Sequence, residues 1–299
     1  LKLCDEMGYT TNFVARSMVT KRTNLIGLVV PSVDNQFMSE LAYHAEVSAR
    51  AHGYNIMLCD SGPDLKQEKT VFKLLLGRQV DGILIVPQSS KSYDNLKSYL
   101  DQVPTVFLSE NLRSQPQSYV AVDNSRGTYL GTQYLYELGH RDILYFGQRQ
   151  STTHQLRAEG YLKACHEFNL TPHFFNSEYS RSSIQGGYQL AKELFRKPLD
   201  CTAVFAATDS NALGILTAAD EMGIDIPGHL SLIGFDNISA TALSRIDLTT
   251  VDQPKRDMAV QAVDMLRDKI ENGTQGYVHQ ILLPTLIQRG TCRKLDPSK

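Results

Sequence analysis

Short apolar runs rich in β-branched residues alternate with amphipathic helical patterns from residue 25 onward, and this alternation constrains the fold more than any other feature. The first four runs lie at 25–31, 54–59, 82–87 and 104–109. Between the first two, residues 38–52 carry apolar side chains at helical spacing and stop at Gly53, which is typical of a helix C-terminus. Apolar strands separated by helices predict a parallel sheet covered on both faces.

The same rhythm resumes after a polar stretch at 110–118 and predicts a second unit. Strands are expected at 119–123, 142–147, 201–207, 230–235 and 248–253. Helices are expected at 127–138 and 212–222, each followed by a glycine. A long helix at 255–272 and a strand at 280–284 complete the pattern, and we assign this helix to the first unit.

The length of 299 residues also favours two lobes, because a single hydrophobic core rarely grows so large. We expect an α/β fold of two doubly wound parallel-sheet lobes. The first comprises residues 25–118 plus about 254–282, and the second comprises residues 119–253 plus about 283–299. Residues 1–24 form a separate N-terminal segment. Ligands of such sheets bind outside the carboxyl ends of the strands, so a ligand is expected between the lobes.

Composition excludes several classes of protein. No apolar run reaches the length of a membrane span, and the net charge of -2 requires any nucleic-acid contact to come from a local basic patch. Five scattered cysteines without a CxxC pair argue against a disulfide framework and against a zinc site. The cysteine pattern and the absence of a signal peptide pattern favour the cytoplasm.

An enzyme is the obvious rival, since doubly wound folds host many reactions. The sequence contains no glycine-rich nucleotide loop, no HExxH and no GxSxG motif. His140 lies in a predicted turn between a helix and a strand, with no nucleophile nearby in the sequence. We therefore expect no catalytic residue, no metal and no cofactor.

The N-terminal segment departs from the strand and helix rhythm. Residues 12–19 predict a short helix that starts at Thr11 or Asn12 and is followed by Lys21 and Arg22. So short a helix needs a partner to be ordered, and that partner is either a lobe or DNA. The first residue is Leu, so we expect the chain to begin inside a longer protein.

Motifs spread over most of the chain carry a family resemblance. They are MGYTTNFVARSMVTKR at 7–22, NQF at 35–37, VDGILIVP at 80–87, VDN at 122–124, LGHRDI at 138–143, RAEGY at 157–161, TAVFAATD at 202–209, DEMGIDIPGHLSLIGFDN at 220–237 and LTTVDQP at 248–254. In this order and spacing they resemble the lactose/galactose repressor family of bacterial transcription regulators. The resemblance implies two periplasmic-binding-protein-like lobes preceded by a hinge helix.

The resemblance also implies a DNA contact and an assembly. Most of the family's helix-turn-helix is expected to lie upstream of Leu1, and residues 12–19 to form the hinge helix that enters the minor groove of operator DNA as a pair in a homodimer. Met18 would be the apolar wedge that bends the duplex, and Arg16, Lys21 and Arg22 would contact phosphate. The implied hinge residues are Asn12, Val14, Ala15, Arg16, Met18, Lys21 and Arg22.

The effector site implied by the resemblance lies between the lobes. Its predicted residues are Phe37, Met38, Asp60, Arg157, Tyr179, Thr208, Asp209, Asp236 and Gln253. Asp236 would accept hydrogen bonds from adjacent hydroxyls and Arg157 would donate, although from pattern alone Asp236 equally suits a helix cap and Arg157 a surface helix. Thr208 replaces the asparagine usual in the family, which removes an amide group and indicates a changed ligand.

The other predicted effector contacts are side chains that line the pocket and a residue where the chain crosses between the lobes. Phe37 and Met38 would form one apolar side of the pocket, although both equally suit a hydrophobic core, and Tyr179 would form the opposite side. Asp60 follows the second strand, where a polar ligand contact is common. Gln253 is either a ligand contact or a hinge residue. The resulting hypothesis is a transcription regulator, expected to be a repressor, that senses a small polar effector, a sugar above all. The alternative is a sugar-binding receptor of the same fold, against which the basic segment in place of a signal peptide argues.

Overall fold

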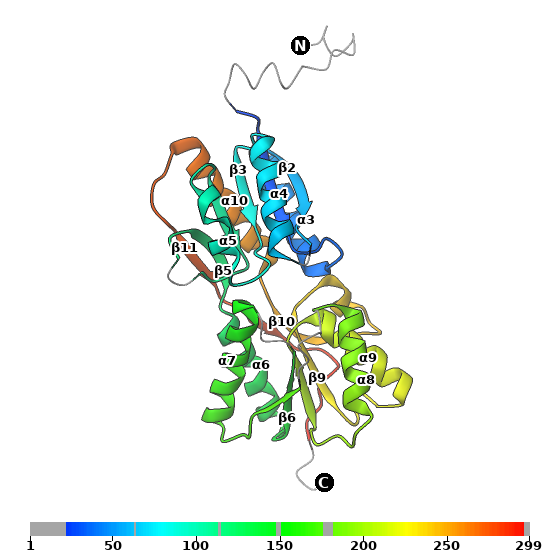
Figure 1. Cartoon of the computed structure of the whole chain (residues 1–299). Coiled ribbons are helices and arrows are strands. Elements are labelled where there is room, and N and C mark those ends of the chain that lie inside the picture. The colour runs from blue at the N-terminus through cyan, green and yellow to red at the C-terminus, as the bar shows by residue number, and fades with distance from the viewer. Residues whose placement is uncertain (1–21, 63, 113–114, 148–150, 176–181, 296–299) are drawn as a thin grey trace.

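The computed structural model describes residues 22–62, 64–112, 115–147, 151–175 and 182–295, which form two lobes stacked along the long axis of the molecule (Figure 1). Each lobe contains one sheet of six strands with helices on both faces. None of the helices in the described ranges has the length and apolar character needed to cross a membrane. The predicted α/β fold with two parallel-sheet lobes is confirmed, and the predicted hinge helix lies outside the described residues.

Lobe 1 is built on a fully parallel sheet with the strand order β11-β5-β4-β3-β1-β2. Its strands are β1 (Leu25–Val30), β2 (Asn55–Asp60), β3 (Gly82–Ile85), β4 (Thr105–Leu108), β5 (Ser118–Val122) and β11 (His279–Leu282). Its helices are α3 (Gln36–Ala51), α4 (Leu65–Gly77), α5 (Ser92–Leu100) and α10 (Lys255–Asn272). The strands β3, β4 and β5 are buried throughout, as near-continuous apolar runs between two helical layers require.

Lobe 2 repeats this design with the strand order β12-β10-β9-β8-β6-β7, in which β12 alone runs antiparallel to its neighbour. Its strands are β6 (Ile143–Phe146), β7 (His173–Phe175), β8 (Ala203–Ala206), β9 (Ser231–Asp236), β10 (Thr249–Asp252) and β12 (Thr285–Ile287). Its helices are α6 (Asn124–Glu137), α7 (Thr152–Glu167), α8 (Ile184–Phe195), α9 (Asp209–Met222) and the short 3-10 helix η1 (Ser239–Ala242).

The helix ends follow from local sequence. Side chains of Asn35, Asp123 and Thr208 accept backbone N–H bonds at the starts of α3, α6 and α9, which satisfies donors that lack a partner within the helix. Gly223 ends α9 in the left-handed conformation at φ 69°, where a side chain would cost energy. The predicted helix at 255–272 coincides with α10.

One predicted assignment is wrong. The strand expected at 119–123 was placed in the second lobe, but β5 pairs with β4 and β11 in lobe 1, with all five of its residues buried. Because β5 begins at Ser118 and pairs with β4, the boundary between the lobes does not lie at the polar stretch 110–118. The chain enters lobe 2 only after β5, returns to lobe 1 for α10 and β11, and crosses again to β12.

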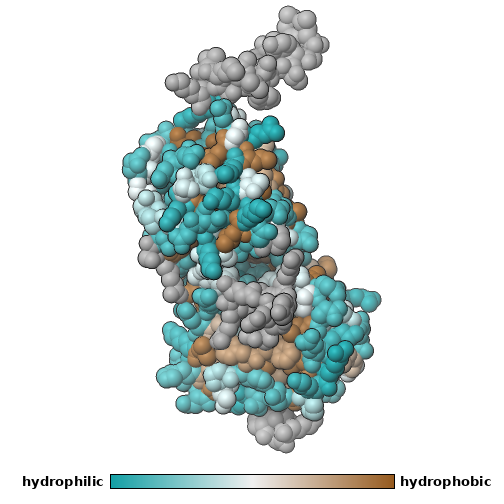
Figure 2. Space-filling model, viewed as in Figure 1, coloured by the Kyte–Doolittle hydropathy of each residue, from teal (hydrophilic) through white to brown (hydrophobic). Residues whose placement is uncertain are grey.

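Apolar contacts also join the lobes. The core cluster of lobe 1 includes Phe37 from the first turn of α3 together with Leu213 of α9 and Ile238 beside η1. The N-terminal end of α3 therefore packs directly on lobe 2, next to the carboxyl ends of the lobe 2 strands. Hydrophilic side chains cover most of the visible surface of both lobes (Figure 2).

Candidate functional site

Three polar side chains meet at the edge of lobe 2 that adjoins lobe 1. Asp236 is the last residue of β9, Gln253 directly follows the neighbouring strand β10, and Asp209 begins α9 after β8. They converge because the carboxyl ends of parallel strands lie at one edge of the sheet. Gln253 Nε2 donates to Asp236 Oδ1 over 2.7 Å.

Arg157, in the second turn of α7, holds the Asp236 carboxylate in place. Its Nη2 lies 3.3 Å from Asp236 Oδ1, its Nε donates to Asn124 Oδ1 over 2.8 Å, and its Nη1 donates to the Ala207 carbonyl over 2.5 Å. The guanidinium carbon lies 3.7 Å from the centre of the Phe235 ring. Arg157 is only 3 % exposed, so the alternative of a surface helix arginine is wrong.

Asp236 occupies a strained and buried position. Its φ of 124° lies in a region that non-glycine residues rarely adopt, and strain of this kind is typical of functional sites. Burial raises the pKa of the carboxyl above its ordinary value, although the Arg157 charge acts in the opposite direction. The alternative role as a helix cap does not apply, because η1 begins at Ser239 and is preceded by Ile238 as its N-cap, with no side-chain cap hydrogen bond.

Asp209 is a second buried carboxyl beside Asp236. It accepts hydrogen bonds from Thr250 Oγ1 over 2.5 Å and from the Ile238 N–H over 2.9 Å. Burial and the Asp236 charge raise the pKa of Asp209 to about 7. A Cβ on Gly234 would lie 2.1 Å from Asp209 Oδ1, so a glycine is required there for the carboxyl to fit. Thr208 Oγ1 caps α9 by accepting from the Asn211 N–H.

The predicted lobe 1 contacts are more dispersed. Phe37 lies in the core cluster that joins the lobes. Met38 is half-buried and lines an apolar pocket between α3 and β2, whereas Asp60 uses its two oxygens to accept from the backbone N–H groups of Val33 and Gly62. The structure thus gives Met38 and Asp60 roles within lobe 1. Tyr179 lies outside the described residues.

Polar ties between the lobes were missed by sequence reasoning. Glu40 of α3 accepts from the Ser239 N–H over 2.8 Å and pairs with Lys255 Nζ at 3.5 Å. Lys255 Nζ also donates to the carbonyl oxygens of Asp236 and Asn237. Lys255 directly follows the LTTVDQP motif, and this position could have marked it as a residue near the site. Nothing in the sequence indicates that it pairs with Glu40.

A second tie lies at the end of β4. Thr153 Oγ1, in the first turn of α7, donates to Glu110 Oε2 over 2.6 Å and lies 3.2 Å from the Ser109 carbonyl oxygen. Glu110 is 5 % exposed, and burial raises the pKa of its carboxyl. Glu110 directly follows a predicted strand, as Asp60 and Asp236 do, so the same sequence criterion could have identified it as a candidate site residue.

The predicted hinge residues Asn12, Val14, Ala15, Arg16, Met18 and Lys21 lie outside the described residues. Arg22 is described, and its Nη2 lies 3.5 Å from the Ile270 carbonyl oxygen at the end of α10. Asp81 then fixes the entry into β1 by accepting from the N–H groups of Thr23 and Asn24, both over 2.8 Å. This entry lies at the end of lobe 1 that is farthest from lobe 2 (Figure 1).

His140 has a structural role. Its two ring nitrogens lie 2.9 Å from Thr202 Oγ1 and 3.1 Å from the Arg293 carbonyl oxygen, and burial lowers its pKa. Within the described ranges, no group of three or more His, Cys, Asp or Glu side chains has the arrangement of a metal site. Lobe 2 thus uses His140 to hold the C-terminal segment against the turn before β6.

Comparisons with known proteins agree with this architecture. The family profile of the periplasmic binding protein-like domain matches residues 132–292. The HTH-type transcriptional repressor PurR of Edwardsiella ictaluri is 32% identical over 289 residues, covering 95% of this chain and 84% of that protein. The relatives are transcription regulators, which confirms the prediction that the chain is not an enzyme.

Solved structures show the same fold. A LacI family transcriptional regulator from Enterococcus faecium with bound ribose has a TM-score of 0.80 and 25% identity, covering 91% of this chain and 100% of that one. The Lac repressor bound to ONPG in its repressed state has a TM-score of 0.85 and 24% identity, covering 96% of this chain and 88% of that one. With this two-lobed fold and these relatives, the chain belongs to the LacI family of transcription regulators.

Proposed function

We propose that the protein is a transcription repressor whose affinity for operator DNA is controlled by a small hydroxylated effector, a sugar or a closely related polyol, bound between the lobes. The observation that carries this proposal is the Asp236 carboxylate, buried at the edge of lobe 2 and oriented by Arg157 and Gln253. An oriented carboxylate suits two adjacent hydroxyl donors, and the Phe37 ring supplies an apolar surface from lobe 1.

The ties between the lobes support a link from effector to DNA. Lys255 of α10, in lobe 1, pairs with Glu40 of α3 and donates to the backbone carbonyl of Asp236, so it links lobe 1 to the residue that carries the effector-binding carboxylate. An effector that alters the position of Asp236 would thereby alter the contacts between the lobes. Since lobe 1 also carries the entry from the hinge segment at Arg22, a change in the angle between the lobes would alter the spacing of paired hinge helices.

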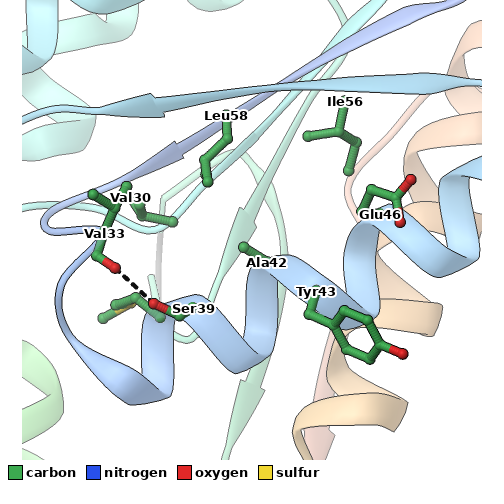
Figure 3. Close-up of a pocket in the computed structure, with 9 residues that line it drawn as sticks. Val30, Val33, Ser39, Ala42, Tyr43, Glu46, Ile56 and Leu58 are labelled. Atoms are coloured by element: carbon green, nitrogen blue, oxygen red, sulfur yellow. Dashed lines mark hydrogen bonds between the residues drawn. The ribbon is translucent and has the colours of Figure 1, made fainter.

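We propose further that the protein acts as a two-fold homodimer through α3 and the edge strand β2. The pocket between these two elements has a volume of about 290 Å³ and an apolar lining that includes Val30, Ala42 and Ile56 (Figure 3). Two further lining residues, Tyr43 and Leu58, are 64% and 47% exposed. Exposed apolar side chains gathered next to an unpaired strand edge suit a second copy of the chain. A two-fold symmetric dimer would also match the two half-sites of a symmetric operator.

Two linked measurements test this function. Thermal unfolding of the protein against neutral sugars and polyols should identify a compound that raises the unfolding temperature, because binding to the native state alone stabilises it. Operator fragments selected from the genome should then bind the full reading frame's product with an affinity that changes when this compound is added. A compound that binds without any change in DNA affinity would favour the receptor alternative.

A further inference from the structure

Glu110 is a charged side chain from lobe 1 that is enclosed at the junction of the lobes. The chain turns after β4 through Ser109, whose φ is 65°, and this turn places Glu110 against the first turn of α7 in lobe 2. Thr153 donates to Glu110 Oε2 over 2.6 Å, while the other oxygen, Oε1, is buried and accepts no hydrogen bond from any described residue. A buried acceptor without a donor is costly, and native proteins retain few of them.

Glu110 Oε1 has a counterpart on the other side of the junction. Gln253 Oε1 is likewise buried and accepts no hydrogen bond within the described part of the chain, whereas its Nε2 donates to Asp236 Oδ1. Asp236 Oδ2, too, accepts nothing from the residues the structure describes, because Gln253 and Arg157 both contact Oδ1. The groups left open between the lobes are therefore oxygens that accept.

The basic side chains of the site already contact protein oxygens. All three nitrogens of the Arg157 guanidinium contact protein oxygens, on Asn124, Ala207 and Asp236. Lys255 Nζ is shared between two carbonyl oxygens and the Glu40 carboxylate. The buried Oε1 atoms of Glu110 and Gln253 therefore call for donors from the effector.

The charges lead to the same conclusion. Each of the two cations has a carboxylate partner, since Arg157 pairs with Asp236 and Lys255 pairs with Glu40. Glu110 forms no ion pair with any described residue, although the Arg157 charge acts at longer range to lower the pKa that burial raises. A carboxylate held in a low-dielectric junction attracts a cation and repels an anion more strongly than one in water.

We propose that Glu110 is the lobe 1 acceptor of the effector site, where it binds an N–H or O–H donor of the ligand, prefers a protonated amine, and excludes phosphorylated or acidic ligands. This proposal rests on the proposed function, because it assumes that the effector binds between the lobes. The proposal specifies the charge of the effector, which is positive or neutral and not negative. It assigns this discrimination to Glu110, which lies outside the cluster formed by Asp236, Arg157 and Gln253. Glu110 is joined to lobe 2 through Thr153, so a donor bound there would also stabilise the contact between the lobes.

Calorimetry with matched probes tests the proposal. The panel comprises D-glucose, D-galactose and D-ribose, the amino sugars D-glucosamine and D-galactosamine, and the phosphates glucose 6-phosphate, galactose 6-phosphate and ribose 5-phosphate. In the wild-type protein, an amino sugar should bind at least about tenfold more tightly than its phosphate counterpart. Glu110→Gln, which retains an acceptor for Thr153, should reduce that ratio at least about tenfold. The control variant Glu193→Gln removes an exposed charge on α8 and should leave the ratio of the two affinities unchanged.

The outcomes separate this proposal from the proposed function. A wild-type protein that prefers the phosphates, or a Glu110→Gln ratio that matches the wild-type ratio, would overturn the role of Glu110. If, in that case, Asp236→Asn still weakens binding of every sugar, the proposed function stands without it. If no panel member binds the wild-type protein, both proposals fail. Thermal unfolding of each variant shows whether it is folded, and Glu110→Ala repeats the test with a side chain that cannot accept.

Discussion

Replacing Asp236 distinguishes its two roles, because Asn and Ala remove different contacts. Asp236→Asn keeps an oxygen that accepts from Gln253 or Arg157 and removes the charge. Asp236→Ala removes every side-chain contact and leaves the Arg157 guanidinium buried without its carboxylate. Because Asp236 is only 5 % exposed and is part of a buried ion pair, the Ala variant should also lose stability.

The magnitudes follow from these contacts. Removing one partner of a buried ion pair costs about 3 to 5 kcal/mol, which is a large part of the roughly 5 to 15 kcal/mol by which a domain is stable. We expect a loss of this size in the free energy of unfolding for Asp236→Ala. Asp236→Asn should unfold closer to wild type and should lose about 1.5 to 3 kcal/mol of effector binding, about ten- to a hundredfold in affinity.

Urea unfolding and calorimetry with a sugar found by screening measure the two effects separately. The matched control is Asp220→Ala, which removes an exposed aspartate from α9 and should change neither quantity. An Asp236→Ala protein with the wild-type unfolding midpoint and slope would refute the structural role of the Arg157 pair. An Asp236→Asn protein that is folded and binds the sugar with wild-type affinity would remove Asp236 from the effector site.

Three further predictions concern pH, assembly and DNA. Burial and the Asp236 charge raise the pKa of Asp209 to about 7, above the value of about 4 in an unfolded chain, so the native state binds the extra proton and stability should fall as pH rises from about 4 to about 7. Urea midpoints measured over this range should show that fall in wild type and a flatter profile in Asp209→Asn, and equal profiles would contradict the assignment. Tyr43→Arg places a charge on the apolar face of α3 and should shift the protein from a dimer toward a 33.4 kDa monomer in sedimentation, whereas a monomeric wild type would exclude the dimer. Met18→Gly should weaken operator binding by removing the apolar wedge without reducing its salt dependence, and unchanged affinity would exclude the wedge.

Much of the fold could be predicted because its signals are local. The apolar runs that became β1, β3 and β4 and the helix that became α10 are defined by residues close together in the chain, and the glycine at 223 marks a helix end by its own backbone conformation. The convergence of Asp236 and Gln253 also follows from local information, since each follows a parallel strand and the strands share an edge.

Contacts between distant segments could not be predicted in this way. The placement of β5 depends on its pairing with β11, some 160 residues later, which the apolar run itself does not specify. Glu40 and Ser239, and likewise Glu110 and Thr153, meet only because two lobes pack together. The same limit explains Asp60, whose position after a strand resembles that of Asp236, although its oxygens serve the backbone of its own lobe.

The central claim is that occupation of the site between the lobes changes the affinity for DNA. Its most direct test is a titration of labelled operator fragments with the product of the full reading frame, in the presence and absence of a sugar identified by thermal unfolding. Because coupling between two binding sites is reciprocal, the factor by which the sugar changes DNA affinity should equal the factor by which DNA changes sugar affinity, and Asp236→Asn should require about ten- to a hundredfold more sugar for the same effect. Operator affinity that is identical with and without saturating sugar would contradict the account.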